Sequence, residues 1–260
     1  MPVKNRFPTT TTVLIAATFV FAGCKAKEQP SPPEQSKAEV PAQPAAAAAP
    51  ETTPAPGSAE AKKPVEAAHN YSKELIAAAK VKEKAPDTYQ VKFDTTRGVF
   101  TVTVTRSWAP LGADRFYSLV KHHFYDHAAF FRVVPQFVVQ FGINANPSVS
   151  SAWKHTEIKD DPVTQSNKRG AIVFATAGPN TRTTQIFINL KDNTRLDSMG
   201  FAPFGTVDGN GMNVVEMMYE GYGDSAGPDQ DQLEKQGDPY LKKGWPKLDY
   251  VKSATLVAAN

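Results

Sequence analysis

The sequence has 260 residues, of which 41% are hydrophobic and 21% are charged, and it contains a single Cys. This length suits one globular domain with extensions. The formal net charge of +3 argues against a nucleic-acid partner, and one Cys excludes both a disulfide framework and a zinc site built on cysteines.

The first residues have the parts of a secretory signal peptide. Lys4 and Arg6 form a basic start, the apolar run Val13–Ala22 follows, and the small residue Gly23 stands directly before the only Cys, Cys24. An apolar run of about ten residues is too short to span a bilayer. We therefore expect residues 1–23 to be removed from the mature chain.

The residues around the expected cleavage position resemble the bacterial lipobox. They read Phe21-Ala22-Gly23-Cys24, and the resemblance implies that Cys24 is acylated and anchors the chain to a membrane. Lys25 stands where an Asp would mark inner-membrane retention in enteric lipoproteins. The expected location is therefore the bacterial cell envelope, at the outer membrane facing the periplasm. The alternative is an ordinary signal peptide that leaves Cys24 lost or as a free thiol.

Residues 24–70 are rich in Ala and Pro, include the run Ala45–Ala49, and contain no Phe, Trp or Tyr. Such a segment cannot bury enough apolar surface to offset the entropy of ordering, so we expect a disordered linker. Residues 71–88 form a lead-in to the domain, where Ser72 could cap one helix extending to Lys84.

From Tyr89 onward the composition changes to aromatic and β-branched residues, and residues 89–260 are expected to form the folded domain. Helical spacing predicts one helix from Pro110 and a second at Met212–Met218. Many short strands with two helices favour a mainly β, antiparallel barrel. The predicted strands are Val91–Phe93, Phe100–Val104, Phe130–Val134, Val138–Phe141, Ala171–Thr176, Gln185–Asn189, Phe204–Val207 and Tyr250–Val257.

Four sequence blocks in this domain are similar to those of the cyclophilins, and they occur in the same order. They are Phe130–Gly142 (FFRVVPQFVVQFG), Ala175–Asn189 (ATAGPNTRTTQIFIN), Leu196-Asp197 and Phe204–Val207 (FGTV). The resemblance extends from about Tyr89 to Val257. It implies a closed eight-stranded antiparallel β-barrel capped by two α-helices, peptidyl-prolyl cis/trans isomerase activity, and no cofactor.

The resemblance also assigns roles in catalysis. Arg132 would donate a hydrogen bond to the prolyl nitrogen, and Gln140 would orient Arg132 and hold the substrate carbonyl. Because that nitrogen becomes an acceptor only when amide resonance is broken, such a donor is selective for the twisted transition state. The implied proline pocket consists of Phe137, Val138, Phe187, Leu196 and Phe201. The substrate strand would lie along Ala175, Thr176, Ala177 and Gln185.

Several positions depart from the family pattern. Phe131 stands where many cyclophilins have His, Val138 where Met is common, Thr176 where Asn is usual, and Phe141 in place of a Gly that leaves more room near Gln140. These departures keep a second function open: a binding module that holds Pro-containing segments with negligible turnover. Under both hypotheses the partners are unfolded or extended Pro-containing polypeptides, with no nucleic acid, and the protein is expected to be a monomer. As an isomerase it would assist the folding of cell-envelope proteins.

Three other patterns carry less weight. Gly223–Gly227 matches G-x-S-x-G, but the surrounding residues predict a loop instead of the strand and helix that a serine nucleophile needs. His122, His123 and His127 lack a recognised partner motif, so no metal site is expected. Asp224, Asp229 and Asp231 are expected to be solvated acidic residues of an insertion-like loop at residues 221–247.

Overall fold

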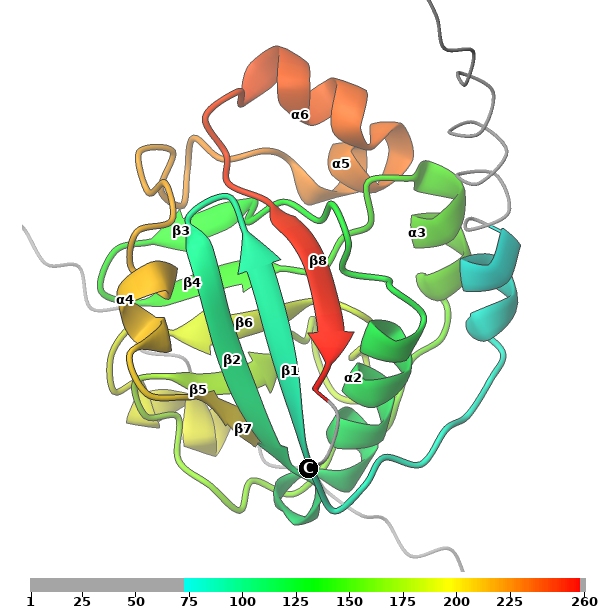
Figure 1. Ribbon diagram of the computed structural model, residues 1–260, viewed down its shortest axis with the longest axis vertical. Helices are drawn as coiled ribbons and strands as arrows, with labels where there is room; N and C mark the ends of the chain where they lie inside the picture. Colours follow the sequence, from blue (N-terminus) through cyan, green and yellow to red (C-terminus); the bar gives the residue numbers. More distant parts are fainter. Residues whose placement is uncertain (1–72, 258–260) are drawn as a thin grey trace, which may run out of the picture. The chain divides into compact units, whose positions relative to one another are not determined.

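The computed structural model describes residues 73–257 (Figure 1). The predicted signal peptide at residues 1–23, the lipidation site Cys24 and the linker at residues 24–70 lie outside the described residues. Within residues 73–257, no helix is both long enough and apolar enough to cross a membrane.

Eight strands form one antiparallel sheet with the order β3-β4-β6-β5-β7-β2-β1-β8 (Figure 1). Each of them overlaps one of the eight strands predicted from the sequence. Their bounds are β1 (Thr88–Thr95), β2 (Gly98–Thr105), β3 (Arg132–Val134), β4 (Val138–Phe141), β5 (Ala171–Phe174), β6 (Ile186–Asn189), β7 (Pro203–Val207) and β8 (Val251–Leu256).

The sheet curls into a half-barrel. Its end strands β3 and β8 share no ladder within the described part of the chain, but the segments beside them are joined. The Phe130 amide donates to the Asp249 carbonyl at 2.9 Å, and the Val251 amide donates to the Ala128 carbonyl at 2.9 Å. The structure thus shows a curled antiparallel sheet whose ends are linked by a few backbone hydrogen bonds, and full closure of the barrel stays a prediction.

Strands β4, β5 and β6 are buried on both faces. Side chains alternate between the two faces of a strand, so every second residue of each strand belongs to the interior of the half-barrel. There they join Phe93, Phe100, Phe116 and Phe204 in the main core, where the Phe93 and Phe100 rings stack with centroids 5.0 Å apart. The intervening residues face outward into a separate apolar cluster, and that outer face carries the candidate site.

The described residues contain more helices than the two predicted for the domain and the one predicted for the lead-in segment. Helix α2 begins at Pro110 as expected, and α4 is shorter than the predicted Met212–Met218. The segments are a helical turn at residues 73–78, η1 (Arg106–Trp108), α2 (Pro110–Lys121), α3 (Pro147–Trp153), η2 (Thr194–Met199), α4 (Gly211–Val215), α5 (Gln230–Gln236) and α6 (Asp238–Gly244). Helix α2 lies against β7 and β8, and α4 lies against β2.

The lead-in segment is held to the domain by contacts with two helices. The Trp153 indole donates to the Leu75 carbonyl at 3.0 Å, and the Ala85 amide donates to Asp114 Oδ1 of α2 at 2.8 Å. Its helical residues end at 78 and not at Lys84. The chain that follows runs along α2, where Ala85 meets Asp114. The proposed cap, Ser72, lies outside the described residues.

The insertion-like stretch at residues 221–247 was predicted to be a loop, and this prediction is wrong for its second half, which forms α5 and α6. Figure 1 shows these two helices together, above the start of β8. The insertion has its own apolar cluster, called the insertion cluster below. It consists of Ala129, Phe131, Ile143, Leu233, Leu241 and Leu248, with Tyr222, Tyr240, Trp245 and Tyr250 packed against them.

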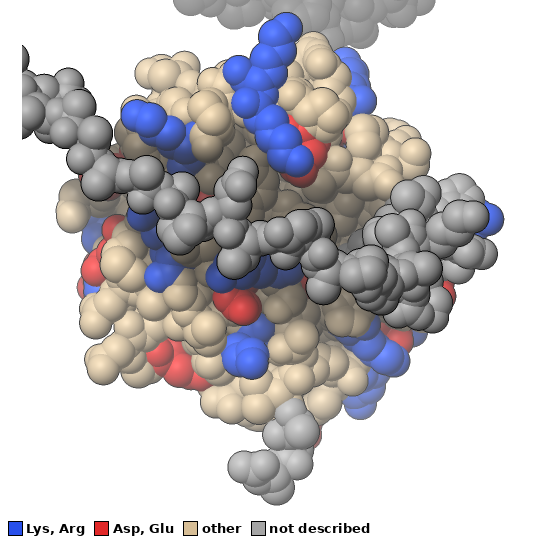
Figure 2. Space-filling view, turned by 45° about the horizontal axis from the view of Figure 1, so that its top comes forward, with Lys and Arg blue, Asp and Glu red and all other residues tan. Residues whose placement is uncertain are grey.

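Positive and negative side chains are interspersed on the face drawn in Figure 2. Several of the exposed charges are paired locally, as in Arg169–Glu216 at 2.6 Å and Lys168–Asp192 at 3.0 Å. Exposed pairs of this kind contribute little stability, typically about 0–1 kcal/mol. Exposed charges of the described residues are thus in part neutralised by local pairs.

Candidate active site

The candidate site begins with a row of four residues on neighbouring strands. In the strand register, Arg132 of β3 lies opposite Gln140 of β4, Gln140 lies opposite Phe187 of β6, and Phe187 lies opposite Val173 of β5. Residues that are directly opposite in an antiparallel pair point to the same face. The sheet therefore brings the predicted catalytic pair and one wall of the predicted pocket to the same outer face.

The polar end of this row is a hydrogen-bonded chain. Arg132 Nη1 donates to Gln140 Oε1 at 3.0 Å, and Gln140 Nε2 donates to Gln185 Oε1 at 2.9 Å. Gln140 is only 8% exposed, so its side chain is fixed between these two partners. This arrangement fits the predicted role of Gln140, which is to orient the guanidinium.

The apolar end of the row is a compact cluster, called the pocket cluster below. Its buried members are Val138, Val173, Phe187 and Leu196, and its half-buried members are Phe137, Ala175 and Phe201. The structure therefore brings together all five predicted pocket residues and adds Val173. The Phe187 and Phe201 rings meet edge to face, with centroids 5.7 Å apart, and Arg132 and Arg195 lie over the Phe137 ring at 5.7 and 5.0 Å.

The predicted substrate strand, Ala175–Ala177, lines a groove of about 370 Å³ together with Gln140 and Gln185. The Ala175 amide donates to the Gln185 carbonyl at 2.9 Å, and the Ala177 amide donates to Thr181 Oγ1 at 2.9 Å. The Thr176 hydroxyl bonds Thr181 Oγ1 at 2.8 Å and also the Gly178 carbonyl. Thr176, which stands where the family usually has Asn, thus forms its side-chain hydrogen bonds within its own loop.

Two of the departures from the family pattern are explained by where the side chains lie. Phe141 was expected to narrow the space near Gln140, but it is fully buried in the main core, with its ring 4.8 Å from that of Phe130. Strand alternation places residues 140 and 141 on opposite faces, so that expectation is wrong. Phe131 points away from Arg132 into the insertion cluster.

Sequence reasoning missed one residue of this site. Asp224 was interpreted as a solvated loop residue, but its Oδ1 accepts a hydrogen bond from Arg132 Nε at 2.6 Å. The side chain of Asp224 is 63% exposed and that of Arg132 is 25% exposed. No sequence signal could have found this pair, because the two residues are 92 positions apart and Asp224 belongs to the insertion.

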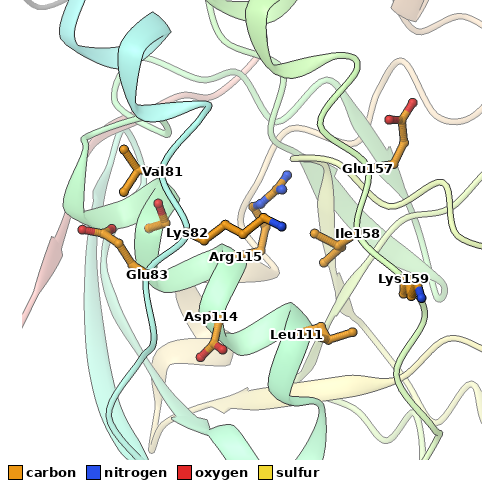
Figure 3. A pocket seen from close by; sticks show the side chains of 10 residues that line it. Val81, Lys82, Glu83, Leu111, Asp114, Arg115, Glu157, Ile158 and Lys159 are labelled. Atoms are coloured by element: carbon orange, nitrogen blue, oxygen red, sulfur yellow. The ribbon is translucent and has the colours of Figure 1, made fainter.

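Another cavity of the domain lies between the lead-in segment, α2 and residues 157–159 (Figure 3). It measures about 430 Å³, and its apolar lining comes from Val81, Leu111 and Ile158. None of the candidate site residues lines it. It is therefore separate from the row that begins at Arg132.

Two of the histidines considered as metal ligands lie beside single carboxylates. His122 Nε2 lies 3.3 Å from Glu83 Oε2, and His123 Nδ1 lies 3.2 Å from Asp126 Oδ2. Among the residues the structure describes, no three His, Cys, Asp or Glu side chains gather where they could hold a metal ion.

The short helix η2 carries Leu196 into the pocket cluster and is anchored by the next residue, Asp197. Its carboxylate accepts hydrogen bonds from the Ser166 hydroxyl at 2.6 Å and from the Asn167 amide and side chain at 2.8 and 2.7 Å. Asn167 in turn donates to the Phe201 carbonyl at 2.8 Å. One carboxylate thus supports two pocket residues.

Replacing Asp197 with Ala is expected to raise KM about three- to tenfold and to leave kcat within about twofold, because the pocket loosens while the arginine stays in place. Asp192→Ala is the matched control, because Asp192 is an exposed carboxylate nearby that does not support the pocket cluster. Steady-state isomerase kinetics on both variants provide the test. An unchanged KM for Asp197→Ala would contradict the anchoring role.

The same carboxylate predicts a dependence of stability on pH. Partial burial tends to raise the pKa of Asp197, but the hydrogen bonds from Ser166 and Asn167 outweigh it and leave the pKa below its usual value. A lowered pKa stabilises the fold above the pKa of the unfolded state, and this contribution is lost as the pH falls through the folded-state pKa. We therefore expect the unfolding temperature of Asp197→Asn to fall less than that of the wild type when the pH is lowered from 6 to 3. This interval spans roughly the range in which an Asp titrates.

Comparisons with known proteins identify the family to which this chain belongs. The family described as cyclophilin type peptidyl-prolyl cis-trans isomerase/CLD matches residues 89–236, more than half of the chain. A peptidyl-prolyl cis-trans isomerase of Acinetobacter baylyi is 34% identical over 134 residues, which cover 48% of this chain and 69% of that protein. A peptidyl-prolyl cis-trans isomerase-like 1 protein of Emericella nidulans is 32% identical over 131 residues, covering 49% and 80% of the two chains.

A solved cyclophilin-type isomerase structure from Cryptosporidium parvum superposes with a TM-score of 0.49 and 19% identity, covering 66% of this chain and 99% of that one. The family assignment rests on the sequence matches. The chain belongs to the cyclophilin-type peptidyl-prolyl cis-trans isomerase family, whose members act on proline-containing peptides.

Proposed function

We propose that this protein is an active prolyl isomerase in which Arg132 stabilises the twisted X–Pro bond. The observation that carries the proposal is the row in which Arg132 and Gln140 lie directly beside the pocket cluster. Arg132 uses Nε for Asp224 and Nη1 for Gln140, and within the described residues no acceptor is bonded to its Nη2. That N–H group is the donor we assign to the prolyl nitrogen.

The chemistry requires no nucleophile, metal or proton transfer. Rotation about an amide faces a barrier of about 18–20 kcal/mol because the nitrogen lone pair is delocalised. At the twisted state that lone pair is localised and becomes an acceptor, so a donor held in place binds the transition state selectively. One preorganised donor contributes about 3–4 kcal/mol. The grip of Phe137, Phe187 and Leu196 on the proline ring supplies further selectivity.

Exchange NMR on an Ala-Pro peptide with the purified protein tests this function. Uncatalysed exchange takes tens of seconds, so exchange in the millisecond range would be unmistakable. If the peptide binds but exchange remains slow, the protein is instead a binding module for Pro-containing segments. The departures at Val138 and Thr176 are the features that favour this second outcome.

We further propose that the chain is a lipoprotein, anchored through Cys24 at the outer membrane, and that it assists the folding of cell-envelope proteins as a monomer. The support is the sequence: a basic and apolar start, the lipobox-like Phe21–Cys24, and a Pro- and Ala-rich spacer before the domain. The intact mass of the protein from the membrane fraction tests the anchor. A mature chain that begins elsewhere, or an unmodified Cys24, would contradict it.

A further inference from the structure

The ion pair between Arg132 and Asp224 joins the candidate catalytic residue to the insertion. Asp224 lies in the segment at residues 216–229, which connects α4 to α5, and Arg132 is the first residue of β3. The Oδ1–Nε distance of 2.6 Å is short for a charge-assisted hydrogen bond. The contact restrains a guanidinium that, in the proposed mechanism, presents one N–H group to the substrate.

The segment that carries Asp224 is fixed on the domain. The Trp245 indole donates to the Ala226 carbonyl at 2.8 Å, and the Asp229 amide donates to the Tyr240 hydroxyl oxygen at 3.2 Å. Tyr222 of the same segment packs against the insertion cluster. Asp224 is therefore held from both sides of its own position along the chain, although its side chain is largely exposed.

The same cluster also fixes the backbone of the arginine. Phe131, the residue directly before Arg132, is 1% exposed and is a member of the insertion cluster. The segment with Asp224 and the start of β3 are thus docked on one apolar unit. This common support keeps the carboxylate and the guanidinium in a constant relative position.

With Asp224 included, the guanidinium is restrained at three places. Nε is bonded to Asp224, Nη1 is bonded to Gln140, and the Phe137 ring lies 5.7 Å from Cζ. The guanidinium is planar, so bonds at Nε and Nη1 together determine the direction of Nη2. We propose that Asp224 is a positioning residue for Arg132, which aims Nη2 at the prolyl nitrogen. This inference rests on the proposed isomerase mechanism.

Because the Arg132–Asp224 ion pair is exposed, a positioning role of Asp224 can be distinguished from a role in stabilising the fold. With side chains 63% and 25% exposed, the ion pair adds little to the stability of the fold. Loss of Asp224 is therefore expected to appear in turnover and not in unfolding. It is also expected to appear in kcat more than in KM, because the pocket cluster that binds the proline ring does not include Asp224.

The test compares Asp224→Ala and Asp224→Glu with a control, Glu220→Gln. Glu220 is an exposed carboxylate of the same segment, so the control removes the same charge without touching Arg132. We expect Asp224→Ala to lower kcat about three- to tenfold with KM within about twofold and an unchanged unfolding temperature. Asp224→Glu should recover at least part of kcat, and Glu220→Gln should match the wild type.

A double variant shows whether Asp224 acts through the arginine. If it does, Asp224→Ala should cost nothing further once Arg132 is Ala, so the two effects are not additive. An active wild type with an unchanged or raised kcat in Asp224→Ala, or fully additive effects, would overturn the positioning role and leave the isomerase function intact. A wild type without turnover would overturn the isomerase function itself.

Discussion

Replacing Arg132 with Ala is expected to lower kcat/KM by roughly two to three orders of magnitude, the loss of one preorganised donor of about 3–4 kcal/mol. The affinity for a Pro-containing peptide should stay within a few-fold, because the pocket cluster that binds the ring remains whole. Exchange NMR measures the turnover, and titration of the same peptide measures the affinity. The unfolding temperature should not fall, since the side chain is partly exposed and ends in an exposed ion pair.

Arg195→Ala is the matched control for this experiment. Arg195 also places its guanidinium over the Phe137 ring, at 5.0 Å, but no hydrogen bond joins its side chain to Gln140. It removes one positive charge from the same rim and should retain most of the activity. If both variants lose activity equally, net charge at the rim and not a directed donor carries the catalysis, and the proposed mechanism is wrong.

Replacing Asp161 with Ala is expected to destabilise the fold by about 3–5 kcal/mol, because it leaves the buried charge of Arg182 without its main partner. The two side chains are 3% and 4% exposed, and Arg182 Nη2 lies 3.1 Å from Asp161 Oδ2. Asp161 also accepts hydrogen bonds from the amides of Leu111 and Gly112 at 3.0 and 2.8 Å, in the first turn of α2. The substitution thus removes an ion pair and the anchor of a helix together.

Denaturant unfolding measures this effect, with Glu216→Gln as the control. Glu216 pairs with Arg169 at 2.6 Å, a shorter contact than that of Asp161 with Arg182, but the side chains are 42% and 46% exposed. Its loss should cost less than about 1 kcal/mol. Similar losses in the two variants would mean that burial does not decide the strength of these ion pairs.

Strand-like runs of apolar and β-branched residues, which show clear alternation in β1 and β2, were sufficient to locate all eight strands, because each strand has at least one face in the main core. In β4 and β6 the same alternation also separates core residues, such as Val139 and Ile188, from site residues, such as Gln140 and Phe187. Alternation alone does not say which face carries a function. The resemblance supplied that assignment, and the register of the sheet places the assigned residues together.

The insertion could not be predicted in the same way. The α5 and α6 segments have only one fully buried Leu each, Leu233 and Leu241, so neither shows a helical apolar stripe. These two Leu side chains are buried in one cluster with Phe131, which lies far earlier in the sequence, and with Leu248, which lies after the end of α6. The contact of Asp224 with Arg132 has the same origin, because it follows from where the insertion docks and not from any local pattern.

The pairing of β1 with β8 affects how the domain folds during synthesis. β1 lies between β2 and β8, and Phe93 is opposite Ala254, so one side of β1 has no backbone partner until β8 has been synthesised. Contacts of such long sequence separation are paid for in loop entropy before they stabilise anything, and they slow folding. A growing chain in which β8 has not yet been synthesised therefore presents an open sheet edge at β1. Completion of the sheet is expected to wait for β8, so the partly folded domain passes through an aggregation-prone stage.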